Sequence, residues 1–589
     1  MEVSMDGKEK TQKSSIVKGG IRTMPFIIAN ESFEKVASYG LLANMILYLT
    51  GEYHITIATG ASILFIWSAT TNFTPILGAF LSDSYLGRFR VIGLGCIISL
   101  LGMILLWLSA MLPGTKPPAC HYPSKDCKSA THSQIALLFS AFALMSIGAG
   151  GIRPCSLAFG ADQLDRPQNP NNARVLQSFF NWYYASVGVS IMLSVTVIVY
   201  IQDNKGWTVG FGVPTILMFF SSLLFFLGSP FYVKAKAHKS LFTGFAQVIT
   251  VAVKNRRLDF PPMEVDGWYH HSKGSDLVAP TNKLRFLNKA CIIRNPEKDI
   301  KADGSAENPW NLCTVEQVED LKSLMKLIPI WSSGIMIAVT INQHSFPVLL
   351  AKTMDRHIGP KFQIPAGSYS VFAILTLTIW VAIYDRIVVP LLARVTGIPR
   401  GIGHKQRMGI GLLISCAATA VAAMVESARR RTAIRQGFAD QGLAVVNMSA
   451  MWLVPQHCLT GLAEAFNAIG QIEFYYSELP KTMSSIGIAL FSLGMGVGNL
   501  CGSLIIGIVN DVTKGGSHDS WVSNNPNKGH FDYYYWVLTI LSFINFFYFI
   551  FCGWIYGPYK ADGTKVLDDK EDEIIVEELS KSRELAVII

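Results

Sequence analysis

The sequence predicts an all-α membrane protein with twelve transmembrane helices in two six-helix halves. Half of the 589 residues are hydrophobic and only 15% are charged, whereas about a quarter of the residues in soluble domains are charged. Apolar segments of about twenty residues recur along the chain, and each is long enough to cross a hydrocarbon core of roughly 30 Å. A long polar segment separates the sixth apolar segment from the seventh.

The predicted spans divide the chain into five parts. We expect an N-terminal tail at 1–23, a six-helix bundle at 24–233, a linker at 234–322, a second six-helix bundle at 323–557 and a C-terminal tail at 558–589. The individual spans are expected at 24–50, 57–82, 91–112, 134–159, 177–201, 209–233, 323–351, 367–390, 408–426, 449–473, 482–510 and 533–557. The first 23 residues are polar and basic, so we expect no cleavable signal peptide.

Basic residues predict the orientation. The N-terminal tail, the loop after the second span, the linker and the loop after the eighth span are all basic and fall on one side. Lysine and arginine favour the cytoplasm, so both termini and the linker are expected inside the cell, in a plasma-membrane protein. Arg429, Arg430 and Arg431 fall on the opposite side. Either the ninth helix is long and projects beyond the bilayer, or the count of membrane spans is wrong by one near this helix.

Cysteines and net charge exclude some classes of site. Cys120 and Cys127 share a polar, proline-rich loop that is expected outside the cell, where a disulfide is plausible; two free thiols are the alternative. The sequence has no CxxC pair and no His/Cys cluster, so no metal site is expected. The net charge of +9 fits basic loops rather than a nucleic-acid surface. Within the linker, 242–253 predicts a short amphipathic helix on the membrane surface.

Three charged residues lie inside the first apolar span: Glu31, Glu34 and Lys35. One ionisable side chain at the centre of a membrane helix costs roughly 2.5–3.5 kcal/mol on insertion scales. The i,i+3 and i,i+4 spacings place all three on one helix face. Two carboxylates and one ammonium in a low-dielectric cavity can hold or release a proton. The alternative is a buried ion pair that only fixes helix packing.

The loop after the second span carries a recognisable motif. Asp83-Ser84-Tyr85-Leu86-Gly87-Arg88-Phe89-Arg90 resembles the D-x-x-x-G-R-x-[KR] loop of the major facilitator superfamily. Gly87 permits a tight turn, and Asp83 and Arg88 can bond neighbouring helix ends in one of two states. We therefore assign these three residues to conformational gating. Six spans, a linker and six spans is also the layout of carriers whose halves rock about a central site.

Several motifs together resemble the proton-coupled oligopeptide transporter family, including its plant nitrate/peptide branch. The motifs are Glu31-Ser32-Phe33-Glu34-Lys35 in the first span, Gly150-Gly151-Ile152-Arg153-Pro154 and Phe159-Gly160-Ala161-Asp162-Gln163 around the fourth, Phe180-Asn181-Trp182-Tyr183-Tyr184 in the fifth, and Phe474-Tyr475-Tyr476-Ser477-Glu478-Leu479-Pro480 before the eleventh. The resemblance runs from about Gly19 to Tyr559 and implies the major facilitator fold.

The resemblance also implies roles for individual residues. Glu31 and Glu34 correspond to acids linked to proton binding, and Lys35 to their basic partner. Arg153 stands where members carry a basic residue facing the first span. Glu464 stands where members carry an acid that contacts substrate or pairs with the seventh span. A static salt bridge is the alternative for Arg153 and for Glu464. Further residues expected to line a substrate cavity are Tyr39, Trp182, Tyr183, Gln343 and His344.

Departures from the family pattern narrow the expected substrate. Peptide carriers follow the first motif with several tyrosines, of which only Tyr39 remains here. Some nitrate-transporting members have a histidine on the seventh span, where this chain has Ile341, with His344 about one turn later. His344 either substitutes for that histidine or lines a helix end.

The sequence therefore predicts a proton-coupled symporter that imports a small anion across the lipid bilayer, with protons as coupling ion and no cofactor. Nitrate is the first expectation. Carboxylate plant hormones (gibberellin, abscisate, jasmonate) come second and di- or tripeptides third. A nutrient sensor that signals more than it transports is a different class that stays open. An enzyme is not expected, because the sequence shows no set of nucleophile, base and orienting group.

Overall fold

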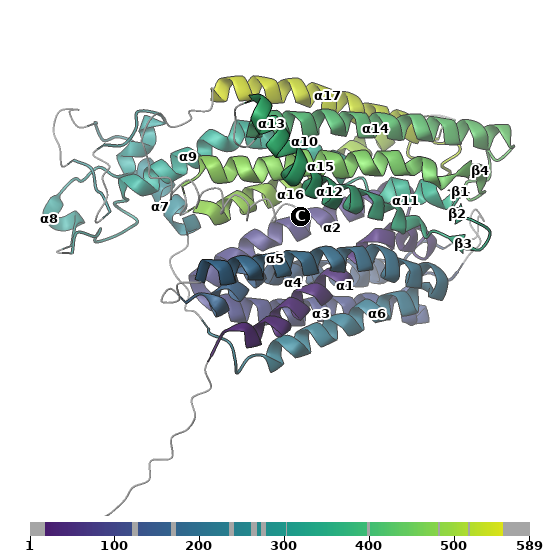
Figure 1. Ribbon diagram of the computed structural model, residues 1–589, viewed down its shortest axis with the longest axis horizontal. Coiled ribbons are helices and arrows are strands. Elements are labelled where there is room, and N and C mark those ends of the chain that lie inside the picture. Colours follow the sequence, from purple (N-terminus) through teal and green to yellow (C-terminus); the bar gives the residue numbers. More distant parts are fainter. Residues whose placement is uncertain are drawn as a thin grey trace, which may run out of the picture.

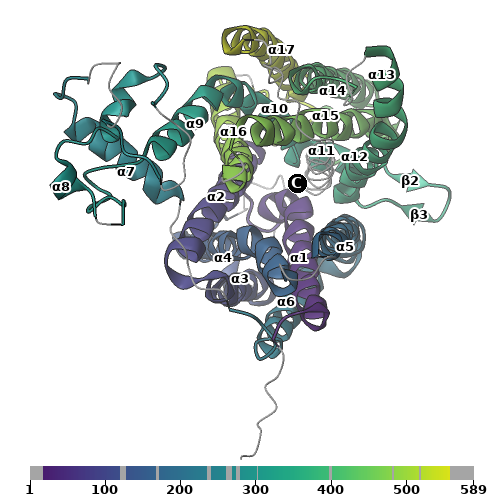
Figure 2. The same ribbon diagram turned by 60° about the vertical axis from the view of Figure 1, so that its left-hand side comes forward.

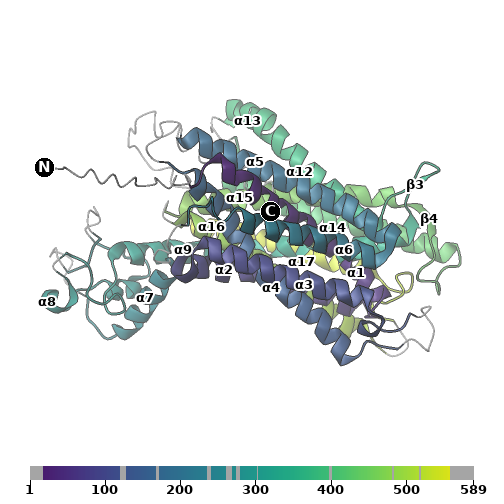
Figure 3. The same ribbon diagram turned by 90° about the horizontal axis from the view of Figure 1, so that it is seen from below.

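The computed structural model describes residues 18–119, 128–166, 172–234, 241–260, 268–272, 279–301, 303–396, 401–480, 483–515 and 519–557. These are the described residues throughout. Long helices run side by side along the longest axis in two groups, with the N-terminal helices below and the C-terminal helices above in Figure 1. The linker projects from one end of the bundles (Figures 1 and 3). We call this the linker end and the opposite end the far end.

The N-terminal group contains six helices: α1 (Met24–Gly51), α2 (Ile57–Leu81), α3 (Arg88–Met111), α4 (His132–Leu164), α5 (Asn172–Leu193) and α6 (Val199–Leu227). Helix α5 continues into α6 without leaving helical hydrogen bonding, and the chain turns at Gly206, which has a φ of 80°. Glycine reaches positive φ without the steric penalty of other residues. The fifth and sixth predicted spans therefore meet at Gly206.

The C-terminal group is less regular. Its helices are α9 (Val315–Ser333), α10 (Ile335–Ile341), α11 (Ser345–Lys352), α12 (Val371–Ile383), α13 (Val389–Thr396), α14 (His404–Arg435), α15 (Val454–Glu478), α16 (Ser484–Thr513) and α17 (Phe531–Tyr556). The seventh predicted span consists of α9, α10 and α11, and it bends by 40° at a short break. Short strands β1 (Met354–Asp355), β2 (His357–Ile358), β3 (Phe362–Gln363) and β4 (Val446–Ser449) lie at the far end (Figure 1).

The helices agree with a membrane-spanning fold. Among the described residues, eight helices are long and apolar enough to cross a membrane, or nine if the bent seventh span is included. The segment 174–227 counts once in that number although it contains both α5 and α6. Helices α1 and α15 do not pass the same test, and both carry charged residues. Helices stand at all twelve predicted ranges, which is consistent with the expected count of spans.

Small residues set the closest helix contacts. A Cβ added at Gly78 of α2 would lie 1.9 Å from the carbonyl oxygen of Gly150 on α4, so only glycine fits at this crossing. Between the two groups, α2 packs along α16, where Phe73 contacts Gly496 and Phe65 contacts Gly502. Figure 2 shows α2 and α16 adjacent at the junction of the groups. Glycine allows such close helix approach in membranes.

The linker contains α7 (Leu241–Lys254) and α8 (Pro296–Asp299). The apolar face of α7 was expected to lie on the membrane surface. Instead, Val248 and Val251 are fully buried and belong to one hydrophobic cluster with Val315, Val318 and other residues of the C-terminal group. Packing against α9 therefore replaces the predicted membrane contact for that face, while Ile249 and Val253 of α7 remain exposed.

Helix α14 accounts for the arginines that opposed the orientation rule. It runs for 32 residues to Arg435, which is about 48 Å at 1.5 Å per residue and longer than the roughly 30 Å hydrocarbon core. Arg429 is completely buried and bonds Glu426 at 2.6 Å and Asn527 at 2.7 Å. Of the two alternatives, the structure therefore agrees with a long helix that projects beyond the bilayer.

Candidate functional site

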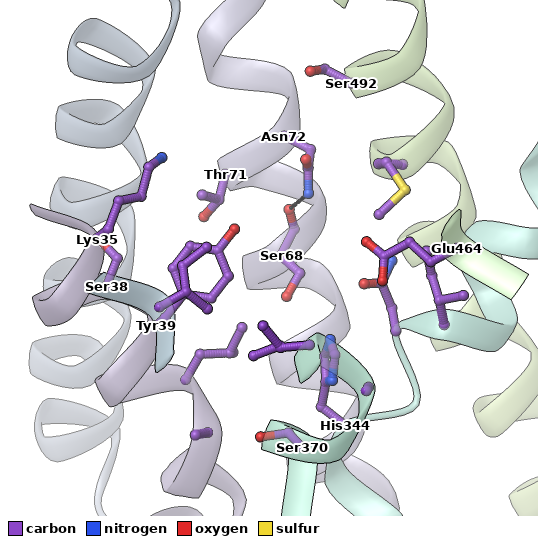
Figure 4. Close-up of a pocket in the computed structure, with 18 of the residues that line it drawn as sticks. Lys35, Ser38, Tyr39, Ser68, Thr71, Asn72, His344, Ser370, Glu464 and Ser492 are labelled. Atoms are coloured by element: carbon purple, nitrogen blue, oxygen red, sulfur yellow. Dashed lines mark hydrogen bonds between the residues drawn. The ribbon is translucent and has the colours of Figure 1, made fainter. Parts of the chain in front are cut away.

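A central cavity of about 580 Å³ lies between the two groups of helices. Its walls come from α1, α2, α4 and α5 on one side and from α10, α11, α12, α14, α15 and α16 on the other. In Figure 4, Lys35 and Tyr39 of α1 face Glu464 and His344 across the cavity, with Ser68, Thr71 and Asn72 of α2 behind them. The lining also includes Ser82, Asp83 and Arg88, so the cavity extends toward the linker end.

The N-terminal wall carries a four-charge cluster of Glu31, Glu34, Lys35 and Arg153. Lys35 Nζ lies 3.2 Å from Glu31 Oε1 and 3.7 Å from Glu34 Oε2. Arg153 Nη2 lies 3.5 Å from Glu34 Oε1. Two negative and two positive groups cancel, and all but Arg153 are at least nine-tenths buried. Glu34 also accepts a hydrogen bond of 2.6 Å from Ser38. The cluster is thus neutral but sensitive to one added proton.

Glu34 is the centre of this cluster. It contacts both basic residues and is fully buried, whereas Glu31 contacts only Lys35 among them and lines the cavity. A proton on Glu34 would leave Arg153, which is 23% exposed, without its carboxylate partner. The Arg153 guanidinium lies 6.0 Å from the centre of the Tyr39 ring, so the tyrosine covers part of the cation.

The gating motif forms at the linker end of α2. A π-helical turn at Ser82–Leu86 ends at Gly87, which has a φ of 78°. This turn brings Arg88 3.8 Å from Asp83 and 2.7 Å from both carboxylate oxygens of Asp162 on α4. In the contact with Asp162, one guanidinium nitrogen donates to both carboxylate oxygens, and this contact is the shorter of the two. The structure therefore brings the three predicted residues together and adds Asp162.

The C-terminal wall differs, because its ionisable groups are not paired with one another. Among the described residues, Glu464 has no hydrogen-bond or ion-pair partner, although it lies on the cavity wall (Figure 4). Gln343 is held instead: its amide donates to Val339 O at 2.9 Å and accepts from Tyr534 at 3.2 Å. His344 precedes α11 and is exposed to the cavity.

The far end is closed by polar contacts between the two groups. Asp203, in the first turn of α6, lies 3.5 Å from Lys352, the last residue of α11, and 3.3 Å from Arg356, which follows α11. The backbone N–H of Ile57 donates to Asn524 at 2.9 Å. We call the contacts of Asp203 with Lys352 and Arg356 the far-end latch. With this end joined and the lining extending to Asp83 and Arg88, the structure is open toward the linker end.

Most predicted site residues reach the cavity. Tyr39, Arg153, Tyr183, Gln343, His344 and Glu464 all line it. Trp182 does not: it is 70% exposed and lies on a different face of α5 from the buried Tyr183. Adjacent residues of a helix point about 100° apart, so a run of three aromatic residues cannot all face one cavity. The prediction for Trp182 is therefore wrong in this conformation.

Cys120 and Cys127 fall outside the described residues. Within the described residues, no group of three or more His, Cys, Asp or Glu side chains is arranged to hold a metal ion.

Sequence reasoning missed three kinds of site residue. Asp162 was part of a quoted motif, but its pairing with Arg88 needs the fourth helix in place. Asp203 lies in a short polar stretch near the start of α6, and nothing in its local sequence indicates partners more than 140 residues away. His457 lines the cavity two turns before Glu464 on α15, and the i,i+7 spacing to that acid would have revealed it.

Comparisons with known proteins agree with these features. The POT family model matches residues 89–522. Protein NRT1/PTR FAMILY 1.2 of Arabidopsis thaliana is 55% identical over 584 residues, covering 98% of this chain and 96% of the relative. Protein NRT1/PTR FAMILY 1.1 of the same plant is 55% identical over 566 residues, covering 95% and 96%.

Among solved structures, an auto-inhibited POT family peptide transporter superposes with a TM-score of 0.66 at 18% identity, covering 93% of this chain and 98% of that one. This likeness confirms the predicted fold class. The resemblance deduced from the motifs is confirmed as well.

Proposed function

The chain belongs to the POT family, and on that premise we propose that it imports a small anion together with protons, with nitrate as the first candidate. The four-charge cluster is the observation that carries this proposal. A neutral, buried cluster next to a cavity gains one net positive charge for each proton that it takes up. The positive charge then attracts an anion to the same cavity, so proton and anion enter together.

The distances support a defined sequence of events. Protonation of Glu34 removes the partner of Arg153 at 3.5 Å and weakens the hold on Lys35 at 3.7 Å. Lys35 keeps Glu31 at 3.2 Å, so Arg153 is the cation that becomes free. Because Arg153 already faces the cavity, its guanidinium can bond two oxygens of a planar anion. Nitrate and carboxylates both have this geometry.

The unpaired Glu464 sets a condition on anion transport. An ionised Glu464 would repel an anion and would offset the single positive charge that the four-charge cluster gains on taking up a proton. We infer that Glu464 also takes a proton when the anion binds. Two protons with one monovalent anion carry a net positive charge inward, and a negative membrane potential favours this by about 2.3 kcal/mol per charge per 100 mV. Orientation with the linker end in the cytosol follows from the basic loops.

The contacts at the linker end and at the far end suggest how the cavity would open to one side at a time. The structure represents the state open to the linker end, with the far-end latch closed. In the opposite state, the latch would be broken and the gating motif at Asp83, Arg88 and Asp162 would bring the linker ends of the groups together. Loss of one buried ion pair in the cluster shifts energies by several kcal/mol, which is enough to bias states that differ by less.

A second candidate is favoured by the same unpaired acid. If Glu464 stays ionised, it can bind an ammonium group while Arg153 binds a carboxylate on the opposite wall. A zwitterion such as a di- or tripeptide would then span the cavity. Hormone carboxylates share the anion chemistry of nitrate and differ in size.

Flux measurements separate the candidates. Purified protein in liposomes with an acid exterior is tested for uptake of nitrate, gibberellate and dialanine. We expect acid-driven uptake of nitrate with inward current; uptake of dialanine alone would support the second candidate. No flux of any solute would contradict transport and favour a sensor.

A variant tests the role of the cation. Arg153→Ala should reduce anion uptake at least tenfold and uptake of an uncharged solute less, because only the anion needs a cation on this wall. Arg431→Ala is the matched control, since Arg431 is exposed at the far end of α14. Equal loss for both solutes would contradict a charge-reading site.

A further inference from the structure

The linker carries a cluster of basic side chains on its surface. We call this cluster the linker patch, and its members are Lys254 at the end of α7, Arg256 and Arg257 directly after it, and Arg285 and Lys289 in the short helix η5 (Arg285–Ala290). Four of the five are exposed, and Lys289 is half-buried. Among the described residues, none of the five forms an ion pair with an acid.

Local contacts join the two segments of the linker patch into one surface. Lys289 Nζ donates to the carbonyl oxygen of Arg256 at 2.7 Å, and Asn255 Nδ2 donates to the carbonyl oxygen of Lys289 at 2.7 Å. The Arg285 guanidinium and the Lys289 ammonium lie 4.2 Å and 4.9 Å from the centre of the Phe260 ring. Because backbone bonds fix both segments, the charges are held close together in the folded protein.

The acids of the linker that could neutralise the patch are engaged elsewhere. Glu319 pairs with Lys322 at 2.7 Å, and Glu316 lies 3.8 Å from His271. In the stretch 254–260, Asp259 is the one acid beside three basic residues. The described part of the linker therefore presents an excess of positive charge at this surface. Such a surface attracts a partner of opposite charge.

The position of the linker patch favours a partner on the aqueous side rather than lipid. Helices α7 and α8 lie beyond the ends of the long helices, which run side by side (Figures 1 and 3). Helix α14 alone is longer than the roughly 30 Å hydrocarbon core. A surface beyond the helix ends is therefore farther from the bilayer centre than the headgroups at those ends.

The C-terminal tail of this chain has complementary chemistry. Residues 568–578 include seven acids and one lysine, with three consecutive aliphatic residues at 574–576. The linker patch has apolar neighbours that match such a segment, because Val253 and Phe286 are both exposed and adjoin patch residues in the sequence. The acidic segment therefore offers both opposite charge and apolar side chains to this surface.

The chain leaves the fold close enough for this segment to reach the patch. The last residue of α17, Tyr556, lies against α9, with Lys326 Nζ 4.3 Å from the centre of its ring. Lys326 is eleven residues from the start of α9 (315 to 326), which is about 16 Å along the helix. Lys254 donates to Asn311, four residues before that start, at 3.3 Å. Eleven extended residues, from 557 to 568, span up to about 36 Å.

We propose that the linker patch is a docking surface for the acidic segment 568–578 of the same chain. The docked carboxylates neutralise the five cations, and the aliphatic residues at 574–576 cover the exposed side chains of Val253 and Phe286. Helices α7 and α17 both pack against α9. The contact therefore lies within the C-terminal group, and it does not depend on which solute the central cavity accepts.

Carbodiimide cross-linking tests this contact, because the reagent joins an ammonium and a carboxylate only when they touch. Full-length protein is held in phosphatidylcholine nanodiscs, and the joined peptides are identified by mass spectrometry. We expect 568–578 to be joined to Lys254 or Lys289 at least fivefold more often than to Lys298 or Lys301, at the linker tip near α8 (Figure 1). The yield should fall at least fivefold between about 0.1 M and about 1 M NaCl, as the screening length falls from about 10 Å to about 3 Å.

Charge reversal on each partner identifies the groups that make the contact. Arg256→Glu/Arg257→Glu should lower the yield at least fivefold, although the reacting lysines are unchanged. Adding Glu571→Lys/Asp572→Lys to that variant should restore at least half of the wild-type yield, because the pairs form again with opposite signs. If a variant does not fold, the salt dependence of the wild-type yield decides alone.

The matched control is Lys298→Glu/Lys301→Glu, which makes the same change of charge at exposed positions of the linker tip and should match wild type. Equal yields at all linker lysines, or a wild-type yield that does not respond to salt, overturn the proposal. An unchanged yield in Arg256→Glu/Arg257→Glu overturns it as well.

Three results would assign the patch or the segment to another partner and so overturn the proposal. The first is a yield that rises with protein concentration, because the contact would then join two copies of the chain. The second is loss of the cross-links in nanodiscs that contain phosphatidylserine, because lipid headgroups would then occupy the patch. The third is a segment joined mainly to lysines of the N-terminal tail, namely Lys8, Lys10 and Lys13.

Discussion

Replacement of Glu34 by glutamine separates the two acids of the first span. The change keeps the shape of the side chain and its hydrogen bond with Ser38, but it removes one charge permanently. Lys35 retains Glu31 at 3.2 Å, while Arg153 loses its carboxylate at 3.5 Å. The variant therefore imitates the state in which Glu34 is protonated. We expect nitrate binding at pH 7.5 to approach the wild-type level at pH 5.5, and acid-stimulated uptake to disappear.

The size of the effect follows from the geometry. At an effective dielectric constant of about 20, opposite charges 3.5 Å apart attract by about 5 kcal/mol before desolvation is subtracted. Removing one partner of a buried pair costs roughly 3–5 kcal/mol. Arg153 is 23% exposed to the cavity, so water compensates part of this, and we expect a loss of about 3 kcal/mol of stability. Glu31→Gln should lose about 1 kcal/mol, because Lys35 keeps Glu34.

The assay combines thermal unfolding with proton-driven uptake into liposomes. Glu52→Gln is the matched control, since Glu52 forms an ion pair with Lys116 at the far end, where it is 30% exposed. Such exposed pairs contribute less than about 1 kcal/mol, and its uptake should stay acid-stimulated. Glu31→Gln should stay folded and lose acid-stimulated uptake. A folded Glu34→Gln protein with the pH profile of wild type would refute the proposed coupling through Arg153.

Two other predictions concern the far end. Asp203→Asn removes both ion pairs of the far-end latch. A cysteine introduced at Ser370 should then react about fivefold faster with a membrane-impermeant thiol reagent added on that side, because the lost ion pairs stabilise the closed end by about 1 kcal/mol. Asp440→Asn is the control, since its partner Lys528 lies in the same half, and it should not change the rate. Arg429→Met leaves Glu426 buried without its partner and should lower the free energy of unfolding by roughly 3–5 kcal/mol, measured by thermal or denaturant unfolding. Arg431→Met is the control at an exposed position of the same helix, and it should change the free energy of unfolding by less than about 0.5 kcal/mol.

Helix positions could be predicted because the membrane imposes a simple rule on composition. A span needs about twenty apolar residues, and interruptions such as the polar turn around Gly206 are visible in the sequence. The grouping of Glu31, Glu34 and Lys35 was also visible, since i,i+3 and i,i+4 spacing fixes a common face before any tertiary contact forms. The roles of Gly87 and Arg88 could also be predicted, because the turn that they form is encoded within a motif of eight consecutive residues.

Partners that are distant in the chain could not be predicted in the same way. The pairing of Asp203 with Arg356 depends on how the N-terminal and C-terminal groups meet, and no local pattern encodes that meeting. The seventh span bends by 40° at Gly334, between α9 and α10. A second interruption, between α10 and α11, has no proline or glycine at its centre, as Asn342 and Gln343 occupy it, so this one could not be read from the sequence. Trp182 was misassigned because the aromatic run was taken together instead of position by position around α5.

The buried contact between α7 and α9 determines how the linker travels. Val248 and Val251 of α7 share one apolar cluster with Val318 and Leu321 of α9, so α7 is packed onto the C-terminal group. If the two groups move as we propose, α7 would move together with the seventh helix. A protein or lipid that held the linker in place would thereby act as a brake on the transport cycle.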